Sequence, residues 1–440
     1  MKFLYIIIFV SLTFSDGLAQ LREKNLPPEH PQISFKASPK PDRIILTWTE
    51  DPATTQTVTW RTDTTVEQAY AQIALADASP SFHDYAKKYE ANHQRLQNEF
   101  SYANYHYITF ENLTPNTKYV YRVGMGHYWS EWIQFQTPKR DFEPFSFIYM
   151  GDAQNNLYSR WARTIRAAYN RSPEAKFVLH VGDLINHSQN DYEWASWFYA
   201  TEFMSKMIPT IAIPGNHEYV KNREGQKTGI SPFWNPQFNY PLNGPKELED
   251  RCFYIDMQGI RVIGLDSNED IKKQAIWLEE VLKNNKNEWT FVMFHHPVVS
   301  AAKGRVNGEI LELWKPILDQ YKVDIVFQGH DHTYARAQNL ITDTNDYEKN
   351  SGTVYLVSVS GTKMYTLSEQ PWMTRAAENT QLFQVIDVEK NHLVYRSYTP
   401  EGKVYDAFKL VKSKGPNILH ELPTDIKTDR RFANTLKEVE

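Results

Sequence analysis

The central part of the chain repeats one pattern, in which a short apolar run with β-branched residues ends abruptly in a polar turn. Such runs predict buried β-strands, and the clearest is 177–181, which passes directly into Gly182 and Asp183. Apolar residues at helical spacing predict helices between the strands, at 161–169, 274–282 and 310–318, the last despite Pro316. Alternating strands and helices indicate an α/β sheet whose strand ends gather polar side chains at one edge.

The preceding region has a different pattern, with short alternating strands and turn signals at regular spacing. Strands are predicted at 44–49, 56–61, 105–110, 119–123 and 132–137. This arrangement is typical of an all-β sandwich. A polar stretch at 81–98 interrupts it and is predicted to be an insertion, helical or irregular.

These patterns divide the chain into four parts. Residues 1–20 combine Lys2, an apolar segment and small residues at the end, which is the pattern of a cleaved signal peptide. Its apolar segment is shorter than the roughly 20 residues of a spanning helix, so export without a membrane span is expected. A β-sandwich domain at 21–139, an α/β catalytic domain at 143–412 and a polar surface tail at 413–440 are predicted to follow.

Charge and cysteine content narrow the choice of partners and compartment. A formal net charge of −5 with intermixed signs leaves no basic patch, which argues against a nucleic-acid partner. The single cysteine, Cys252, excludes an internal disulfide and a thiolate metal site, and its strand-like surroundings predict burial. An exported chain without disulfides is more typical of a bacterial periplasmic or secreted protein. The sequence carries no signal for a particular oligomeric state.

Five predicted strand ends carry side chains that can bind metal ions. They are Gly151-Asp152, Gly182-Asp183, Gly215-Asn216-His217-Glu218, His295-His296 and Gly329-His330-Asp331-His332. Carboxylate, amide and imidazole groups suit ions such as Mn, Fe and Zn, and soft thiolate ligands are missing. Two ions about 3.5–4 Å apart need a shared anionic ligand, and Asp183 is predicted to be that bridge. Such a pair polarises a phosphoryl group and generates hydroxide at mild pH.

In this order, the five motifs resemble those of the calcineurin-like metallophosphoesterases, over residues 145 to about 365. The Leu-Thr-Pro-Asn-Thr run at 113–117 and the strand after it resemble fibronectin type III modules. With such a domain in front, the chain is most similar to purple acid phosphatases. The resemblance implies a four-layer αββα phosphoesterase sandwich, preceded by an all-β N-terminal domain of the fibronectin and purple-acid-phosphatase type.

The resemblance also implies the residues of a dinuclear centre that holds Fe, Zn or Mn as divalent or trivalent ions. Site 1 would take Asp152, Asp183 and His332, and site 2 would take Asp183, Asn216, His295 and His330. His217 would contact the substrate phosphate or protonate the leaving group, with Asp152 or Glu218 as its partner. Asp183 and His217 are thus the expected catalytic residues.

Three positions depart from the resemblance. Purple acid phosphatases carry a tyrosine, the ferric ligand that gives their colour, where this chain has Asn186, so a purple protein is not expected. Most other members carry a histidine where this chain has Gln154. Either amide oxygen could complete site 1, or both side chains could form turn hydrogen bonds. A histidine pair of the plant enzymes is also absent, and near its place Arg305 could hold a phosphate.

Other polar residues have simpler structural interpretations. His296 is a candidate substrate contact or a packing residue beside the site. His180 lies inside a predicted strand and is expected in the core, and His187 is expected in an exposed loop. Arg336 could form a structural ion pair or serve in catalysis. The aromatic residues at 194–199 have helical spacing, which indicates core packing.

The sequence therefore predicts an exported dinuclear-metal phosphoesterase. It would hydrolyse phosphate monoesters by in-line attack of a metal-bound hydroxide, acting on a small phosphoester substrate. Phosphodiester or nucleotide pyrophosphate cleavage on the same metal centre is the alternative, because pocket shape decides between them. The remaining alternative is a non-catalytic surface-binding protein with a relic metal site, against which the complete set of six core ligands argues.

Overall fold

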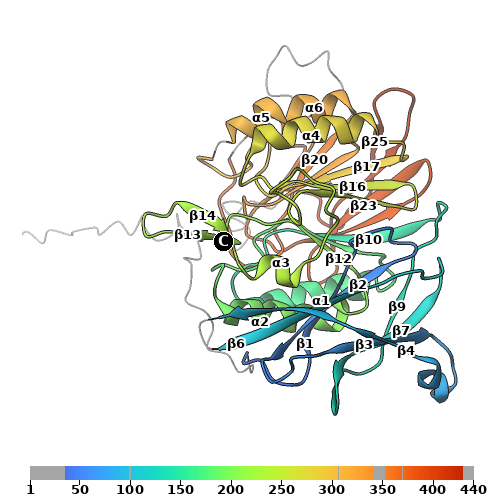
Figure 1. The fold of residues 1–440 in the computed structure, drawn as a ribbon. Coiled ribbons are helices and arrows are strands. Elements are labelled where there is room, and N and C mark those ends of the chain that lie inside the picture. Colours follow the sequence, from blue (N-terminus) through green and yellow to red (C-terminus); the bar gives the residue numbers. More distant parts are fainter. Residues whose placement is uncertain (1–34, 99–100, 306, 340–351, 369, 430–440) are drawn as a thin grey trace, which may run out of the picture.

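The computed structural model describes residues 35–98, 101–305, 307–339, 352–368 and 370–429. The predicted signal peptide at 1–20 lies outside them. An all-β region comes first and an α/β region follows, and the two lie against each other (Figure 1). In the part of the chain that is described, no helix combines the length and the apolar character needed to cross a membrane.

The all-β region consists of two antiparallel sheets, which confirms the predicted sandwich. One sheet has the order β1-β2-β6-β5, with β1 (Asp42–Thr47), β2 (Gln56–Asp63), β6 (Tyr102–Phe110) and β5 (Asn92–Gln97). The other contains β3 (Tyr70–Leu75), β4 (Lys87–Glu90), β7 (Lys118–Met125), β8 (Tyr128–Trp129) and β9 (Ile133–Gln136). Apolar side chains from both, such as Trp60 and Phe135, form one core.

The segment 81–98, predicted to be a helical or irregular insertion, is helical only at its start. It begins in the 3-10 helix η1 (Pro80–Tyr85) and continues as the strands β4 and β5. Nearly all side chains of these two strands are exposed. The segment therefore lacks the apolar and polar alternation that identifies a half-buried strand.

The α/β region contains two sheets of seven strands. The first has the order β12 (Thr210–Ala212), β11 (Val178–His180), β10 (Phe145–Met150), β22 (Phe383–Val388), β23 (His392–Tyr398), β24 (Val404–Val411) and β25 (Ile418–Glu421). The second has the order β15 (Phe253–Met257), β16 (Ile260–Gly264), β17 (Trp289–Met293), β18 (Ile325–Gln328), β20 (Val354–Val357), β19 (Tyr334–Gln338) and β21 (Arg375–Ala377).

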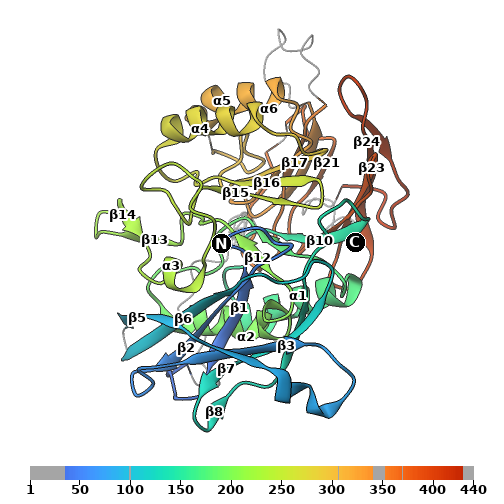
Figure 2. The ribbon, with the colours of Figure 1, turned by 45° about the vertical axis from the view of Figure 1, so that its right-hand side comes forward.

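Helices cover the outer faces of the two sheets, so the predicted αββα sandwich is confirmed. The π-helix η2 (Leu157–Trp161), α1 (Ala162–Arg171) and α2 (Asp191–Ser205) lie between the first sheet and the all-β region (Figure 1). The helices α4 (Ile271–Lys283), α5 (Gly308–Leu313) and α6 (Lys315–Gln320) cover the second sheet at the top of both views (Figure 2). Phe147 of β10 and Phe327 of β18 contact one another between the sheets.

Two elements differ from their predicted limits. The helix predicted at 310–318 is split into α5 and α6 at Trp314. Pro316 lies in the first turn of α6, where a helix needs no backbone N–H. The polar tail predicted at 413–440 begins with sheet structure, because β25 pairs antiparallel with β24.

A buried interface joins the all-β region to α2. Trp48 packs with its ring centroid 6.1 Å from that of Phe177. Asp191, the first residue of α2, is fully buried and ion-paired with Arg43 at 2.8 Å and with Arg61 at 3.1 Å. Two cations of the all-β region thus converge on one carboxylate of the α/β region.

A hairpin and a short helix follow β12, and several predicted core residues are buried. The hairpin of β13 (Tyr219–Lys221) and β14 (Lys227–Ile230) and the short helix α3 (Trp234–Gln237) follow β12. Cys252 is buried, as predicted. Trp194 and Trp197 of α2 are buried in the core beside the first sheet, which confirms the packing role predicted for this aromatic segment.

Candidate metal centre

Four strands of the two sheets end at one place. β10 and β11 are parallel neighbours in the first sheet, and β17 and β18 are parallel neighbours in the second. The turns that follow these strands carry Asp152, Asp183, His295 and His330. Because the carboxyl ends of parallel strands share one sheet edge, and the two sheets face each other, these side chains meet.

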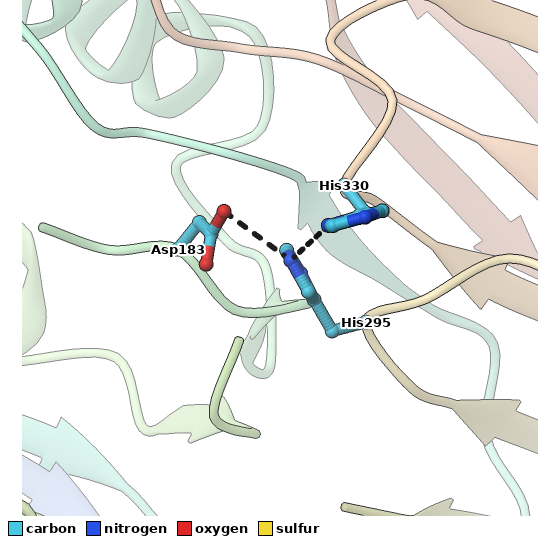
Figure 3. A group of neighbouring side chains, drawn as sticks. All are labelled: Asp183, His295 and His330. Atoms are coloured by element: carbon cyan, nitrogen blue, oxygen red, sulfur yellow. Dashed lines mark hydrogen bonds and ion pairs between the residues drawn. The ribbon is translucent and has the colours of Figure 1, made fainter. Parts of the chain in front are cut away.

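The first group of potential ligands contains Asp183, His295 and His330, whose ligand atoms lie within 4.8 Å of one another (Figure 3). His295 Nε2 lies 3.2 Å from Asp183 Oδ2 and 3.1 Å from His330 Nδ1. It also lies 3.2 Å from Asn216 Oδ1. The four residues expected at site 2 therefore lie together.

The second group contains Asp152, Asp183 and His332, again within 4.8 Å of one another. The side-chain nitrogen of Gln154 lies 3.1 Å from Asp183 Oδ2 and 3.0 Å from His332 Nε2. Asp183 is the one residue common to both groups. This sharing is the geometry that a dinuclear metal centre with a bridging carboxylate requires.

The donor set fits such a centre. The amide oxygens of Gln154 and Asn186 are buried and have no hydrogen-bond partner. An unpaired buried oxygen is unfavourable, and a cation would satisfy it. All donors gathered here are oxygen or nitrogen atoms, which suit Mn, Fe and Zn ions.

The backbone of these turns is strained. Asp152, Asp183, His330 and His332 have positive φ angles of 43°, 51°, 71° and 50°. Such left-handed conformations are unfavourable for residues with a Cβ atom and concentrate at functional sites. Gly215 allows the closest approach, since a Cβ atom there would lie 2.2 Å from Asp183 Oδ1. These turns hold the ligand side chains in fixed directions.

Hydrogen bonds around the site orient its side chains. The Nδ1 of His295 donates to the Val181 carbonyl at 2.8 Å, which turns Nε2 toward Asp183. The Glu218 carboxylate accepts from the backbone N–H groups of Asp183 at 2.9 Å and of Gly215 at 2.7 Å. Glu218 thus ties two motif turns together.

The prediction that Asp152 or Glu218 is the partner of His217 is wrong. The Nδ1 of His217 donates to the backbone carbonyl of Asn186 at 2.6 Å. Glu218 is occupied by backbone N–H groups, and Asp152 accepts from the backbone N–H of His330 at 2.9 Å. A backbone carbonyl can only accept, so His217 presents its Nε2 to the site.

The buried carboxylates and imidazoles shift one another's pKa values. Burial and the nearby Asp183 raise the pKa of Asp152 well above its usual value, against the effect of His295. Although burial opposes it, His295 and His217 hold the pKa of Asp183 well below its usual value. Burial likewise opposes the effect of Asp183, which raises the pKa of His295 to about 9. Because metal ligands must be deprotonated, cations would compete with these protons.

The predicted substrate contacts lie beside the two groups. The His296 ring centroid lies 4.2 Å from that of His330, and its Nδ1 is 2.8 Å from Ser267 Oγ. Arg305 donates to the His330 carbonyl at 2.9 Å, and its guanidinium lies 4.6 Å from the Tyr365 ring centroid.

The comparisons with known proteins agree with this geometry. Residues 145–334 match the calcineurin-like phosphoesterase family, and residues 41–137 match the purple acid phosphatase N-terminal domain. The chain therefore combines a purple acid phosphatase N-terminal domain with a calcineurin-like phosphoesterase domain. The resemblances to calcineurin-like phosphoesterases and to purple acid phosphatases are confirmed.

Plant purple acid phosphatases are among the curated proteins similar to this chain. The purple acid phosphatase of Glycine max is 30% identical over 251 residues, covering 53% of this chain and 53% of its own. The Fe(3+)-Zn(2+) purple acid phosphatase 12 of Arabidopsis thaliana is 28% identical over 267 residues, covering 55% of each chain. This chain spans about half the length of both relatives. Purple acid phosphatase PPD1 from yellow lupin seeds (Lupinus luteus) superposes with a TM-score of 0.69 at 17% identity, covering 85% of this chain and 75% of its own, and shares the fold.

Other sequence candidates lie away from the two ligand groups or serve packing. Arg336 is buried and pairs with Asp406 at 2.7 Å and with Glu421 at 2.9 Å, which supports the ion-pair interpretation. His187 pairs with Glu193 at 2.7 Å. His180 is buried in β11, as predicted.

Sequence patterns did not reveal the roles of three residues around the two ligand groups. Glu218 was considered only as a partner of His217, although its carboxylate holds the motif turns. Lys363 and Tyr365 follow β20, where the sequence shows no metal-binding motif. The His332 and Tyr365 ring centroids are 4.7 Å apart. A signal was available, since a lysine in an otherwise small and uncharged segment, Ser358 to Met364, is unusual near strand ends.

Proposed function

We propose that this protein is a metal-dependent phosphatase that hydrolyses phosphate monoesters. The observation that carries the proposal is the pair of ligand groups that share Asp183 where β10, β11, β17 and β18 end. The match to phosphoesterases, together with the purple acid phosphatase N-terminal domain, supports a phosphoester as substrate.

Eight side chains make up the proposed metal centre. Asp152, Asp183 and His332, with Gln154 and Asn186, would hold one metal ion, and Asp183, Asn216, His295 and His330 would hold the other. When bound, two such ions polarise the phosphoryl group and lower the pKa of water. Neither amide carries a charge, so the first site favours a divalent ion, Mn, Zn or ferrous iron, over a ferric ion.

The chain's own residues position the substrate. His217 presents Nε2 toward the site while its Nδ1 is held by the Asn186 carbonyl, so Nε2 can accept a hydrogen bond there. Arg305 and His296 stand beside His330 and would contact the rest of the substrate. The proposal also includes export by residues 1–20 to the periplasm or the medium, which N-terminal sequencing of the mature protein tests.

The test compares p-nitrophenyl phosphate with bis(p-nitrophenyl) phosphate, using full-chain protein loaded with Mn, Zn or Fe. We expect higher kcat/KM on the monoester, and Asn216→Ala should abolish turnover while the circular dichroism spectrum stays unchanged. Asn284→Ala, at the end of α4, is the control that keeps full activity.

Each other outcome has a defined meaning. Preference for the diester would support the phosphodiesterase alternative. Metal-loaded protein that cleaves neither ester would contradict the proposal and support a binding role. Normal turnover by Asn216→Ala would remove Asn216 from the metal centre.

A further inference from the structure

A buried lysine contacts the proposed site from the loop that follows β20. Only 6% of the Lys363 surface is exposed, and its Nζ lies 3.4 Å from His217 Nε2. Within the described ranges, no carboxylate oxygen lies within 4.0 Å of this Nζ. A buried ammonium group without a carboxylate partner is costly. Lys363 is therefore suited to an anion that arrives from outside the chain.

The loop that carries Lys363 is fixed to the metal-site turns. The backbone N–H of Ser360 donates to the Gly151 carbonyl at 2.7 Å, and that of Gly361 donates to the Asp152 carbonyl at 2.8 Å. On the other side of Lys363, the backbone N–H of Tyr365 donates to the His332 carbonyl at 3.2 Å. Lys363 thus lies between two points of attachment to the proposed site.

His217 leaves part of the lysine free to bind. Because Nδ1 of His217 donates to the Asn186 carbonyl, the neutral ring offers only an acceptor at Nε2. Lys363 Nζ has three N–H donors, and one of them satisfies this acceptor. His217 Nε2 itself lies 4.0 Å from Asp183 Oδ2, so the His217 ring connects Lys363 to the proposed bridging carboxylate, and the other two N–H donors of Lys363 stay available for a ligand.

A second cation, Arg305, lies near the Tyr365 ring that Lys363 also approaches. The Tyr365 centroid lies 5.7 Å from Lys363 Nζ and 4.6 Å from the Arg305 guanidinium. Two positive charges therefore border the site next to His332. A phosphate monoester carries close to two negative charges at pH 7, since its second pKa is about 6, whereas a diester carries one.

We propose that Lys363 is a positioning residue that binds a non-bridging oxygen of the substrate phosphate and selects dianionic monoesters over monoanionic diesters. This inference rests on the proposed function. It assigns to the chain a phosphate contact that lies outside the five sequence motifs.

The test uses Lys363→Met and Lys363→Arg in metal-loaded, full-chain protein. A hydrogen bond to a charged group contributes about 1.5–3 kcal/mol, so kcat/KM of Lys363→Met on p-nitrophenyl phosphate should fall about 10- to 100-fold, mainly through KM. On bis(p-nitrophenyl) phosphate we expect kcat/KM of Lys363→Met to fall less than about 3-fold, because the diester carries one negative charge fewer than the monoester. Lys363→Arg should restore much of the monoester activity.

A matched control and a binding measurement separate the possibilities. Lys315→Met removes another buried lysine, which pairs with Asp319 on α6, and should leave KM unchanged. Calorimetry with orthophosphate should show about 10-fold or greater weakening for Lys363→Met at unchanged metal content.

Two results would overturn the inference. One is an unchanged monoester-to-diester ratio with unchanged orthophosphate affinity in Lys363→Met. The other is loss of bound metal in that variant, which would place Lys363 in support of the ligands. Wild-type protein that cleaves neither ester would contradict the proposed function, and orthophosphate binding would still report on Lys363.

Discussion

The side-chain nitrogen of Gln154 lies 3.1 Å from Asp183 Oδ2, inside the second group of potential metal ligands. The amide oxygen of the same side chain is buried without a hydrogen-bond partner. Most members of the calcineurin-like family that the sequence resembles carry a histidine at this position. A neutral amide is a weaker donor than an imidazole, so the ion beside Gln154 should be the more easily lost of the two.

Substituting Gln154 should change metal retention. We expect Gln154→Ala to keep about one ion per chain after dialysis against a weak chelator under conditions in which the wild-type protein keeps two. Gln154→His should retain both ions against a stronger chelator. Elemental analysis measures the metal content directly. Gln136→Ala, in β9 of the all-β region, should behave as wild type, and equal metal retention by Gln154→Ala and the wild type would remove Gln154 from the ligand set.

For His217→Ala we expect similar losses of kcat with good and poor leaving groups. The Nδ1 of His217 donates to the Asn186 carbonyl and its Nε2 faces Lys363, so the neutral ring has no proton to give to a leaving group. Comparing p-nitrophenyl phosphate with an alkyl phosphate measures the difference. A general acid would contribute about 10²–10⁴-fold with the poor leaving group. A loss of that size with the alkyl phosphate alone would restore the proton-donor role.

Most of the fold and the proposed ligand positions could be predicted because they depend on local patterns. Asp152, Asp183 and His295 each lie two or three residues beyond the end of an apolar strand, so the end of the strand fixes where the side chain lies. The strands β4 and β5 could not be predicted in this way. Their side chains are exposed, so no burial pattern marks them.

Contacts between residues far apart in the sequence also could not be predicted. Lys363 contacts His217 only because the loop after β20 is hydrogen-bonded to the turn after β10, more than two hundred residues earlier. Glu218 looks like a catalytic partner in sequence, since it adjoins His217. Its carboxylate instead binds the backbone of the turn after β11, which a linear motif does not reveal.

Asp191 should be important for stability because it is the common partner of two buried cations. Its side chain is fully buried, and those of Arg43 and Arg61 are 3% and 1% exposed. Asp191→Asn would leave these guanidinium groups without this counter-charge, so we expect the free energy of unfolding to fall by about 3–5 kcal/mol. Urea unfolding of the wild type and the variant measures this difference in the free energy of unfolding.

A surface ion pair is the control for Asp191. Asp387 pairs with Arg396 at 2.9 Å, and both side chains are at least a third exposed. Asp387→Asn should therefore cost less than about 1 kcal/mol. If both variants lost the same small amount of stability, the interface between the all-β region and α2 would not depend on the buried pair.

His180 should make the fold sensitive to acid. It is buried in β11 between Trp161 and Trp197, with ring centroids 6.2 Å and 5.5 Å away, and burial lowers its pKa to about 3. The unfolded chain binds a proton below a pKa of about 6.5, whereas the folded chain does not, so stability is fully present above pH 6.5 and is lost as pH falls toward 3. Each pH unit within this window costs about 1.4 kcal/mol.

His180→Phe removes the titrating group and keeps an aromatic ring between the two tryptophans. His180 Nε2 has no hydrogen-bond partner, so the substitution sacrifices no bond at that atom. Between pH 6.5 and 5 the free energy of unfolding of the variant should fall by about 2 kcal/mol less than that of the wild type, as measured by urea unfolding at each pH. His420→Gln, an exposed position in β25, should leave the pH dependence unchanged. Parallel pH curves for the wild type and His180→Phe would show that His180 does not resist protonation in the fold, and that other groups cause any acid sensitivity.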